Sequence, residues 1–328
     1  MNKQQNIVRK GNRIYLRIFL NAKWHWYYFD IDSDVIGAGA MGTVYLGYSC
    51  EDNMPVAIKQ VKPLFAEVPS IRKRAHTEAS MMFRHRNLVE MLGCCEPHPS
   101  AGPIYIISKF VFGTNLDDFI KENMSNMPAA LRCTKICDLL FPVMNALEYI
   151  HSHGIVHLDI KPSNIMVENG RNVRLMDLGI SNTQEALLED IKISFIGTPK
   201  YAAPEQFGLG YGGQGANVTS DIYSLAITMY ELLTGRNPFE SNDLKSGIEL
   251  RKRKILPYSI NVPNAIVDVL RKATAFNQAE RYNSISEFRN AIQDAMHKKQ
   301  RNWRPLIIGV ISFIILILLL ITIILLVL

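Results

Sequence analysis

A glycine-rich segment near residue 40 is the first place where this sequence could perform chemistry. The segment Gly37-Ala38-Gly39-Ala40-Met41-Gly42-Thr43-Val44 spaces three glycines so that the backbone can approach phosphate groups closely and adopt positive φ angles. Taken alone the pattern is weak, because glycine patterns recur by chance. Strand-like residues lie on both sides of it, whereas a dinucleotide-binding fold needs a helix directly after the glycines. The segment therefore predicts a phosphate-binding loop between two strands.

A lysine follows this loop at a spacing that adds to the prediction. Lys59 ends the run Val56-Ala57-Ile58-Lys59, fifteen residues after Val44. A lysine on a strand beside a glycine loop can reach the α and β phosphates of a nucleotide. It needs an acidic partner to hold its position, and Glu78 on the next expected helix is the candidate. A lone lysine on a strand is usually a solvated edge residue, so Lys59 gains its meaning from the motifs that follow.

Three further motifs complete the series. They are His157-Leu158-Asp159-Ile160-Lys161-Pro162-Ser163-Asn164, Asp177-Leu178-Gly179 and Ala203-Pro204-Glu205. Asp159 lies five residues before Asn164, and Asn164 lies thirteen residues before Asp177. With the glycine loop and Lys59, this order and spacing resembles the protein kinase superfamily over about residues 33–296. The resemblance implies an α+β, bilobal fold with a small β-rich lobe and a large helical lobe.

The resemblance also implies a role for each of these residues in transferring the γ-phosphate of ATP. Lys59, held by Glu78, would bind the α and β phosphates, while Asn164 and Asp177 would hold Mg²⁺, with Mn²⁺ as an alternative. Asp159 would accept the proton of the attacking hydroxyl, and Lys161 would neutralise the γ-phosphate. The expected ATP-binding residues are Ile36, Gly37, Ala38, Gly39, Ala40, Met41, Gly42, Val44, Ala57, Lys59, Ser108 and Met166.

Other segments resemble the parts of this family that support catalysis. Gly197-Thr198-Pro199 is similar to the substrate-docking segment, and Thr198 with Lys161 is typical of Ser/Thr kinases. Asp221 resembles the aspartate that braces the catalytic loop, and Arg281 resembles the arginine that pairs with Glu205. The glycine loop with Met41 at its tip, and the sequence Ala-Pro-Glu-Gln, resemble bacterial Ser/Thr kinases of the eukaryotic-like type.

Several positions depart from the family pattern. Leu158 stands where the family has an arginine that binds a phosphate of the activation segment, and a leucine cannot do so. Leu178 replaces a phenylalanine, and Lys109 stands where an acid is usual. Ser108 occupies the gatekeeper position, which would leave the pocket behind the adenine open. The glycine-rich segment 208–215 looks like a short insertion and has no functional interpretation.

The elements that must position these motifs can be read from hydrophobic patterns. Short strand-like runs dominate about residues 33–110, and one helix is expected over 70–84. Helical patterns dominate from residue 116 onward, at 128–152, 220–235, 244–253, 263–273 and 285–296. We therefore expect a small lobe at about 33–110 and a large lobe at about 111–296. Residues 1–32 form a basic and aromatic extension that predicts a β-hairpin, either packed on the small lobe or serving as a regulatory or membrane-touching element.

The charges and the apolar end of the chain predict a membrane protein. The 328 residues carry a net charge of +6, but residues 1–25 contain six bases and no acid, and 297–304 contain four bases. The segment between them is mildly acidic, which excludes a nucleic-acid partner in favour of a membrane surface. Pro305–Leu328 has no charge and is long enough for a transmembrane helix. We expect a single-pass C-terminal anchor with a basic linker at 297–304 and a cytoplasmic kinase domain.

These observations favour a membrane-anchored Ser/Thr protein kinase whose protein substrates lie near the bilayer. A pseudokinase that acts as a membrane-bound scaffold is one alternative, but pseudokinases usually lack an equivalent of Lys59, Asp159 or Asp177. Phosphotransfer to a small molecule is another alternative, which the docking segment and Asp221 disfavour. The sequence leaves the substrate, the signal and the oligomeric state open, a dimer included. Its five cysteines are expected to be reduced thiols.

Overall fold

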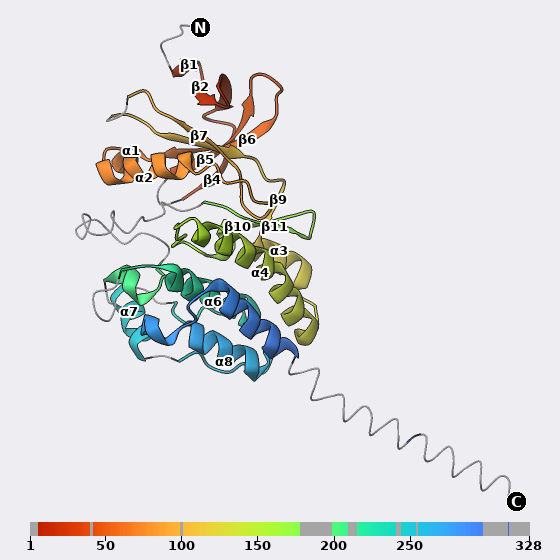
Figure 1. The fold of residues 1–328 in the computed structure, drawn as a ribbon. Coiled ribbons are helices and arrows are strands. Elements are labelled where there is room, and N and C mark those ends of the chain that lie inside the picture. The colour runs from red at the N-terminus through yellow and green to blue at the C-terminus, as the bar shows by residue number, and fades with distance from the viewer. Residues whose placement is uncertain are drawn as a thin grey trace, which may run out of the picture.

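The computed structural model describes residues 6–39, 42–98, 101–177, 199–208, 215–240, 244–253 and 255–297, together with Ile314. Two lobes are stacked along the long axis of the molecule, with strands gathered in one lobe and helices in the other (Figure 1). This is the bilobal α+β arrangement that the motif series predicts.

The small lobe is built on an eight-stranded antiparallel sheet in the order β1-β2-β3-β5-β6-β8-β7, with β4 paired to β5. The strands are β1 (Ile7–Lys10), β2 (Arg13–Leu20), β3 (Lys23–Asp30), β4 (Val35–Ala38), β5 (Gly42–Ser49), β6 (Pro55–Val61), β7 (Met91–Cys95) and β8 (Tyr105–Lys109). Helices α1 (Pro63–Ala66) and α2 (Pro69–Ser80) follow β6. Helix α2 ends four residues before the expected boundary at residue 84.

Residues 1–32 were expected to form an extension, and 13–30 form a hairpin that joins the small-lobe sheet. Tyr28 of β3 pairs with Tyr48 of β5, which makes the hairpin continuous with the strands of the glycine loop. Alternate hairpin residues, among them Leu16 and Phe29, are fully buried. They share one hydrophobic cluster with Ile58 of β6 and Ile107 of β8. The hairpin therefore supplies one wall of the small-lobe core, because it covers a face of the sheet that would otherwise meet water.

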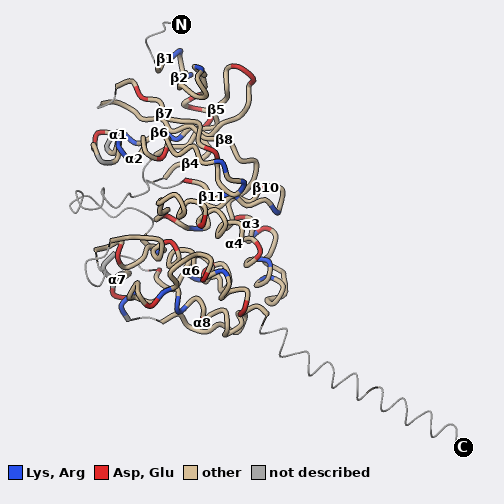
Figure 2. The backbone as a smooth tube through the Cα atoms, in the orientation of Figure 1, with Lys and Arg blue, Asp and Glu red and all other residues tan. Residues whose placement is uncertain are grey.

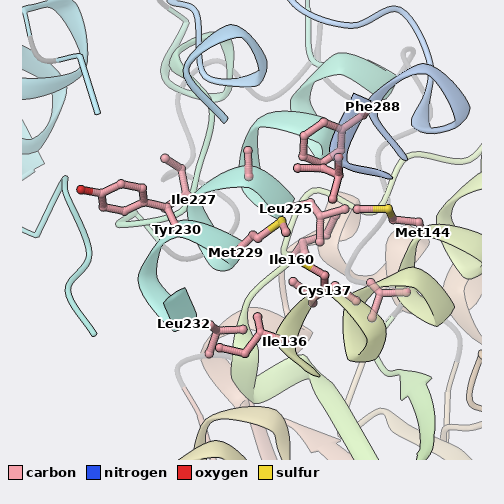
Figure 3. Packing of buried hydrophobic residues seen from close by; sticks show 14 of the residues in the cluster. Ile136, Cys137, Met144, Ile160, Leu225, Ile227, Met229, Tyr230, Leu232 and Phe288 are labelled. Carbon is pink, nitrogen blue, oxygen red and sulfur yellow. The ribbon is translucent and has the colours of Figure 1, made fainter. Parts of the chain in front are cut away.

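The large lobe packs its helices around a single apolar core. Its helices are α3 (Leu116–Met124), α4 (Ala129–Ser152), α6 (Val218–Thr234), α7 (Leu244–Arg253), α8 (Asn264–Ala273) and a last helix over 285–297. Met144 of α4, Leu225 of α6 and Phe288 of the last helix meet at the centre, beside Ile160 (Figure 3). Because Ile160 lies next to the motif residue Asp159, this core supports the loop that carries the chemistry.

A small three-stranded sheet between the lobes was not predicted. It has the order β11-β10-β9 and contains β9 (Gly113–Asn115), β10 (Ile165–Glu168) and β11 (Asn172–Leu175). Gly113 is required there, because a Cβ atom would lie 2.2 Å from the carbonyl oxygen of Val167. This sheet fixes the ends of the two segments that carry Asn164 and Asp177.

The transmembrane helix expected at 305–328 lies outside the described residues, apart from Ile314, which is helical. Among the residues that the structure describes, no helix has both the length and the apolar composition needed to cross a bilayer.

Candidate active site

Three motif residues converge in the loop between α4 and β10. The Lys161 ammonium lies 2.8 Å from the Oδ2 atom of Asp159. Asn164 donates from Nδ2 to the backbone oxygen of Asp159 at 2.8 Å and to its Oδ2 atom at 3.0 Å. These bonds hold the Asp159 carboxylate in one orientation, which a group that accepts a proton during the reaction requires. The Oδ1 atom of Asn164 takes no part in these bonds.

The lobes are joined at the site by an ion pair between Lys59 and Asp177. Nζ of Lys59, on β6, lies 3.2 Å from Oδ2 of Asp177, which directly follows β11 and Met176. Burial opposes the charge on the lysine, but the carboxylates of Asp177 and Glu78 outweigh it and raise the pKa of Lys59. Asp177 has a φ of +44°, a conformation that is rare outside glycine and asparagine and is often kept at functional sites. The positive charge of Lys59 is therefore stabilised by the carboxylates around it.

Glu78 lies in the same interior but does not make the predicted direct pair. Its side chain is buried, and its Oε2 atom has no hydrogen-bond partner. Among the described residues, Lys59 forms its ion pair with Asp177 and not with Glu78. Burial, the largest effect, and the Asp177 charge raise the pKa of Glu78 against the opposing effect of Lys59. The carboxyl of Glu78 is thus buried, and it does not contact its expected partner Lys59 directly.

Asp221 braces the catalytic loop as expected. Its carboxylate accepts hydrogen bonds from the backbone N–H groups of His157 at 2.8 Å and Leu158 at 2.7 Å. Asp221 lies in the first turn of α6, which Asn217 caps, so the helix fixes the position of the Asp221 carboxylate. Leu158 needs such support because its φ is +64°. The sequence did not identify two other residues of this network: His151 contacts Asp221 at 2.8 Å, and Gln206 donates to the carbonyl of Leu158 at 2.9 Å.

Glu205 and Arg281 form the predicted pair in a fully buried position. Two parallel contacts of 2.7 and 2.9 Å join the guanidinium to the carboxylate, and neither side chain is exposed. Ser220 donates a further hydrogen bond to Glu205 at 2.5 Å. Burial alone would raise the pKa of Glu205, but Arg281 and Ser220 outweigh burial and lower it. The pair ties the Ala-Pro-Glu motif to the segment that precedes the last helix.

Several of the expected ATP-binding residues lie on neighbouring strands of the small-lobe sheet. Val44 pairs with Lys59, and Ala57 pairs with Ser108, so all four side chains share one face of the sheet. Gly42 is required at its position, because a Cβ atom there would lie 2.4 Å from the carbonyl oxygen of Gln60. Gly37 and Ala38 pair with residues of β5, and the backbone N–H of Gly39 donates to the carbonyl of Gly42. Ile36 lies at a bulge and is half exposed. Met166 is on β10 opposite Asn115, while Ala40 and Met41 lie outside the described residues.

The oxygen donors of this site fit a magnesium ion and a nucleotide. Asp177 offers a carboxylate and Asn164 an amide oxygen, the hard donors that Mg²⁺ prefers. Lys59 offers a cation beside the glycine loop, where phosphates would lie. Thr198 and Leu178 lie outside the described residues, as does most of the segment 208–215.

Comparison with known proteins decides the family. A model of the protein kinase domain matches residues 31–305. The chain belongs to the protein kinase family. It is 32% identical over 279 residues to the serine/threonine-protein kinase Pkn1 of Myxococcus xanthus, a match that covers 81% of this chain and 38% of that protein.

Other relatives are also bacterial kinases. The chain is 31% identical over 283 residues to the probable serine/threonine-protein kinase PknB of Lactococcus lactis, covering 83% of this chain and 43% of the relative. It is 28% identical over 274 residues to the serine/threonine-protein kinase PrkC of Bacillus subtilis, covering 82% and 40%. The matched region spans about two fifths of the length of each relative. This kinase domain is therefore of the bacterial Ser/Thr type, and strands β1 to β3 precede the region that the family model matches.

Proposed function

We propose that this kinase domain transfers the γ-phosphate of ATP to serine or threonine hydroxyls of proteins. The observation that carries the proposal is the cluster of Asp159, Lys161 and Asn164 opposite the Lys59–Asp177 pair. Asp159 receives the proton of the attacking hydroxyl, and the bonds from Lys161 and Asn164 keep its carboxylate aimed. Lys59 and Lys161 stabilise the negative charge of the phosphoryl group during transfer. Magnesium held by Asn164 and Asp177 would supply the remaining countercharge.

A polar cavity beside Lys161 supports a peptide as the acceptor. Its volume is about 270 Å³, and its lining residues are Asn115, Asp117, Asp118, Lys161, Pro162, Ser163, Lys200, Tyr201 and Glu231. Tyr201 and Lys200 belong to the docking segment, so the cavity connects that segment to the catalytic loop.

The activity test compares the chain with two variants. Purified protein is incubated with ATP, Mg²⁺ and a generic basic protein, and phosphate incorporation into serine and threonine is measured. Wild type should phosphorylate the acceptor, Asp159→Asn should not, and Lys135→Gln, a change at an exposed position of α4, should match wild type. If the wild type bound nucleotide but transferred no phosphate, the pseudokinase alternative would be favoured. The cluster of Lys59, Asp159 and Asp177 argues against that alternative.

We also propose that residues 305–328 anchor the kinase in a membrane, with the kinase domain in the cytoplasm. The support is compositional: this run is uncharged, and Lys298, Lys299, Arg301 and Arg304 directly precede it. Substrates near the bilayer would then be favoured, because only residues 298–304 separate the helical residues described at 285–297 from the uncharged run. Full chain should resist carbonate extraction from membranes, and a chain truncated after Lys299 should be soluble and active. Digestion of the kinase domain by protease outside intact cells would overturn the orientation.

A further inference from the structure

The outer face of the β2–β3 hairpin carries aromatic and arginine side chains that have no part in phosphoryl transfer. Cross-strand partners lie on the same face of a sheet. The register pairs Tyr15 with Tyr28, Arg17 with Trp26, and Phe19 with Trp24, and Arg13 precedes them on the same face. We call these seven residues the outer ladder. Their neighbours in the chain, such as Leu16 and Phe29, point into the core.

The ladder is held together by contacts between tilted rings and between rings and guanidinium groups. The Arg17 guanidinium lies 4.3 Å from the ring centre of Trp24 and 5.5 Å from that of Trp26. The rings of Phe19 and Trp24 are 5.2 Å apart and tilted by 60°. These contacts hold the rings of Phe19 and Trp24 while both stay exposed, whereas Arg17 is partly buried and also donates to Oδ1 of Asn6 at 3.3 Å.

The most exposed part of the ladder lies at the tip of the hairpin. Phe19 is 58% exposed and Trp24 is 51% exposed, which is unusual for rings of this size. They flank a tight turn in which Asn21 and Ala22 both have positive φ angles, as a two-residue type I′ turn requires. The turn projects these two rings together at the end of a rigid hairpin.

The charged residues of β2 and β3 are basic at the tip of the hairpin, where Arg17 and Lys23 lie, whereas Arg13 at the base of the hairpin lies opposite Asp30. The first 25 residues contain six bases and no acid, and basic positions mark β1 and β2 in Figure 2. We propose that the outer ladder is a contact surface for an anionic lipid bilayer, with Phe19 and Trp24 entering the headgroup region. Tryptophan and tyrosine favour the boundary between headgroups and acyl chains. The bases Arg17 and Lys23, at the tip, are attracted to an anionic surface.

Two other occupants fit this face less well. A second copy packed by two-fold symmetry would bring the same arginines toward each other, and like charges oppose such an interface. A single-stranded nucleic acid would need open ring faces for its bases. Here Arg17 covers the rings of Trp24 and Trp26, and Tyr15 and Tyr28 are tilted by 34° against each other. Exposed ring edges beside basic side chains suit a lipid headgroup region better than a stack of nucleobases.

The inference does not rest on the anchor proposed at 305–328. The hairpin and the last helix of the large lobe lie at opposite ends of the molecule (Figure 1). If both ends contact one bilayer, the long axis of the kinase lies along the membrane surface. The cleft between the lobes would then be held beside the bilayer, where it can reach membrane-bound acceptors.

Tryptophan quenching tests the proposal on the full chain. The chain has three tryptophans, so Trp303→Phe leaves only Trp24 and Trp26 as reporters. This protein is combined with vesicles of phosphatidylcholine, with or without phosphatidylglycerol, that carry lipids brominated on the acyl chain. We expect quenching in the anionic vesicles, little in the neutral ones, and loss of quenching at high ionic strength. Arg17→Gln with Lys23→Gln should lower the docked-to-undocked ratio about thirtyfold.

The controls separate this proposal from the anchor and from a folding defect. Lys121→Gln with Lys252→Gln removes two exposed bases of the large lobe and should leave the quenching unchanged. Phe19→Ser should reduce the quenching while phosphorylation of a soluble acceptor stays at the wild-type rate. Protein that resists carbonate extraction without tryptophan quenching overturns the proposal and keeps the anchor. Quenching of extractable protein keeps the proposal and overturns the anchor. Quenching by a single-stranded oligonucleotide, with none by vesicles, assigns the ladder to nucleic acid instead.

Discussion

The ammonium of Lys59 lies 3.2 Å from the carboxylate of Asp177, and this pair connects the small-lobe sheet to the catalytic lobe. Asp177 is also the carboxylate that the family uses for magnesium. A metal ion there would compete with Lys59 for the same oxygen atoms. Glu78 is buried nearby with an unbonded carboxylate oxygen, so it can compensate the lysine charge when Asp177 turns to a metal. We therefore expect Glu78 to pair directly with Lys59 when a nucleotide is bound.

Replacing Asp177 should abolish activity while the fold survives. Asp177→Asn removes the metal-binding charge, and the loss of several kcal/mol of transition-state stabilisation lowers the rate tenfold for each ~1.4 kcal/mol. The Lys59–Asp177 pair is partly exposed, with side chains 21% and 41% accessible, so its loss should cost little stability. Phosphate transfer and thermal unfolding should be measured on the same preparation. Wild-type activity in a folded Asp177→Asn protein would contradict the assignment of the metal site.

The motif chemistry could be derived from the sequence because it depends on residue types at fixed spacings. Asp159, Asn164 and Asp177 are close in the chain, and short elements leave them few relative arrangements. His151 and Gln206 were missed because their roles depend on tertiary contacts with Asp221 and Leu158. Strands β9 to β11 were missed because they have only three or four residues, too few for a periodic signal. The direct Lys59–Glu78 pair was expected from the family, but spacing does not determine which carboxylate the lysine contacts in a given state.

Breaking the Glu205–Arg281 pair should destabilise the protein strongly. Arg281→Leu leaves Glu205 as an uncompensated buried charge, so we expect a loss of about 3–5 kcal/mol in the free energy of unfolding. The matched control is Lys121→Ala, which breaks the exposed pair with Asp117 and should change stability by less than about 1 kcal/mol. Denaturant unfolding measures both.

The same pair predicts how stability depends on pH. The pKa of Glu205 is lowered in the folded state from its ordinary value of 4.5, so the folded protein binds this proton less tightly than the unfolded chain. The stabilisation is present above pH 4.5 and is lost as the pH falls through the folded-state pKa. Glu205→Gln should be less stable at neutral pH and should lose less stability on acidification. A variant with the same acid dependence as wild type would show that another group is responsible.

Activity should not depend on a phosphate bound beside the catalytic loop. Leu158 is buried in a small cluster with Val156 and Ala216, where the family's arginine would present a charge to a phosphate. Fully dephosphorylated protein should therefore retain most of its activity, as measured after phosphatase treatment and removal of the phosphatase. Ser181, Thr183 and Ser194 can still be phosphorylated without this consequence. A large loss of activity on dephosphorylation, reproduced by Ser194→Ala, would refute the prediction.

The hairpin should contribute to the stability of the kinase although it precedes the region that the family model matches. Phe29 is fully buried, and its ring centre lies 4.5 Å from that of Tyr45 on β5 and 5.8 Å from that of Tyr105 on β8. Phe29→Ala removes these contacts and leaves a cavity in the small-lobe core, so we expect a loss of about 3–5 kcal/mol. Phe19→Ala is the matched control, because Phe19 lies on the exposed face of the same hairpin and its removal should change stability by less than about 0.5 kcal/mol. The unfolding of the small lobe should be followed together with kinase activity, since the core behind Ile58 also supports β6 and Lys59. If Phe29→Ala unfolds like wild type, the hairpin is an independent appendage and the core assigned to it is wrong.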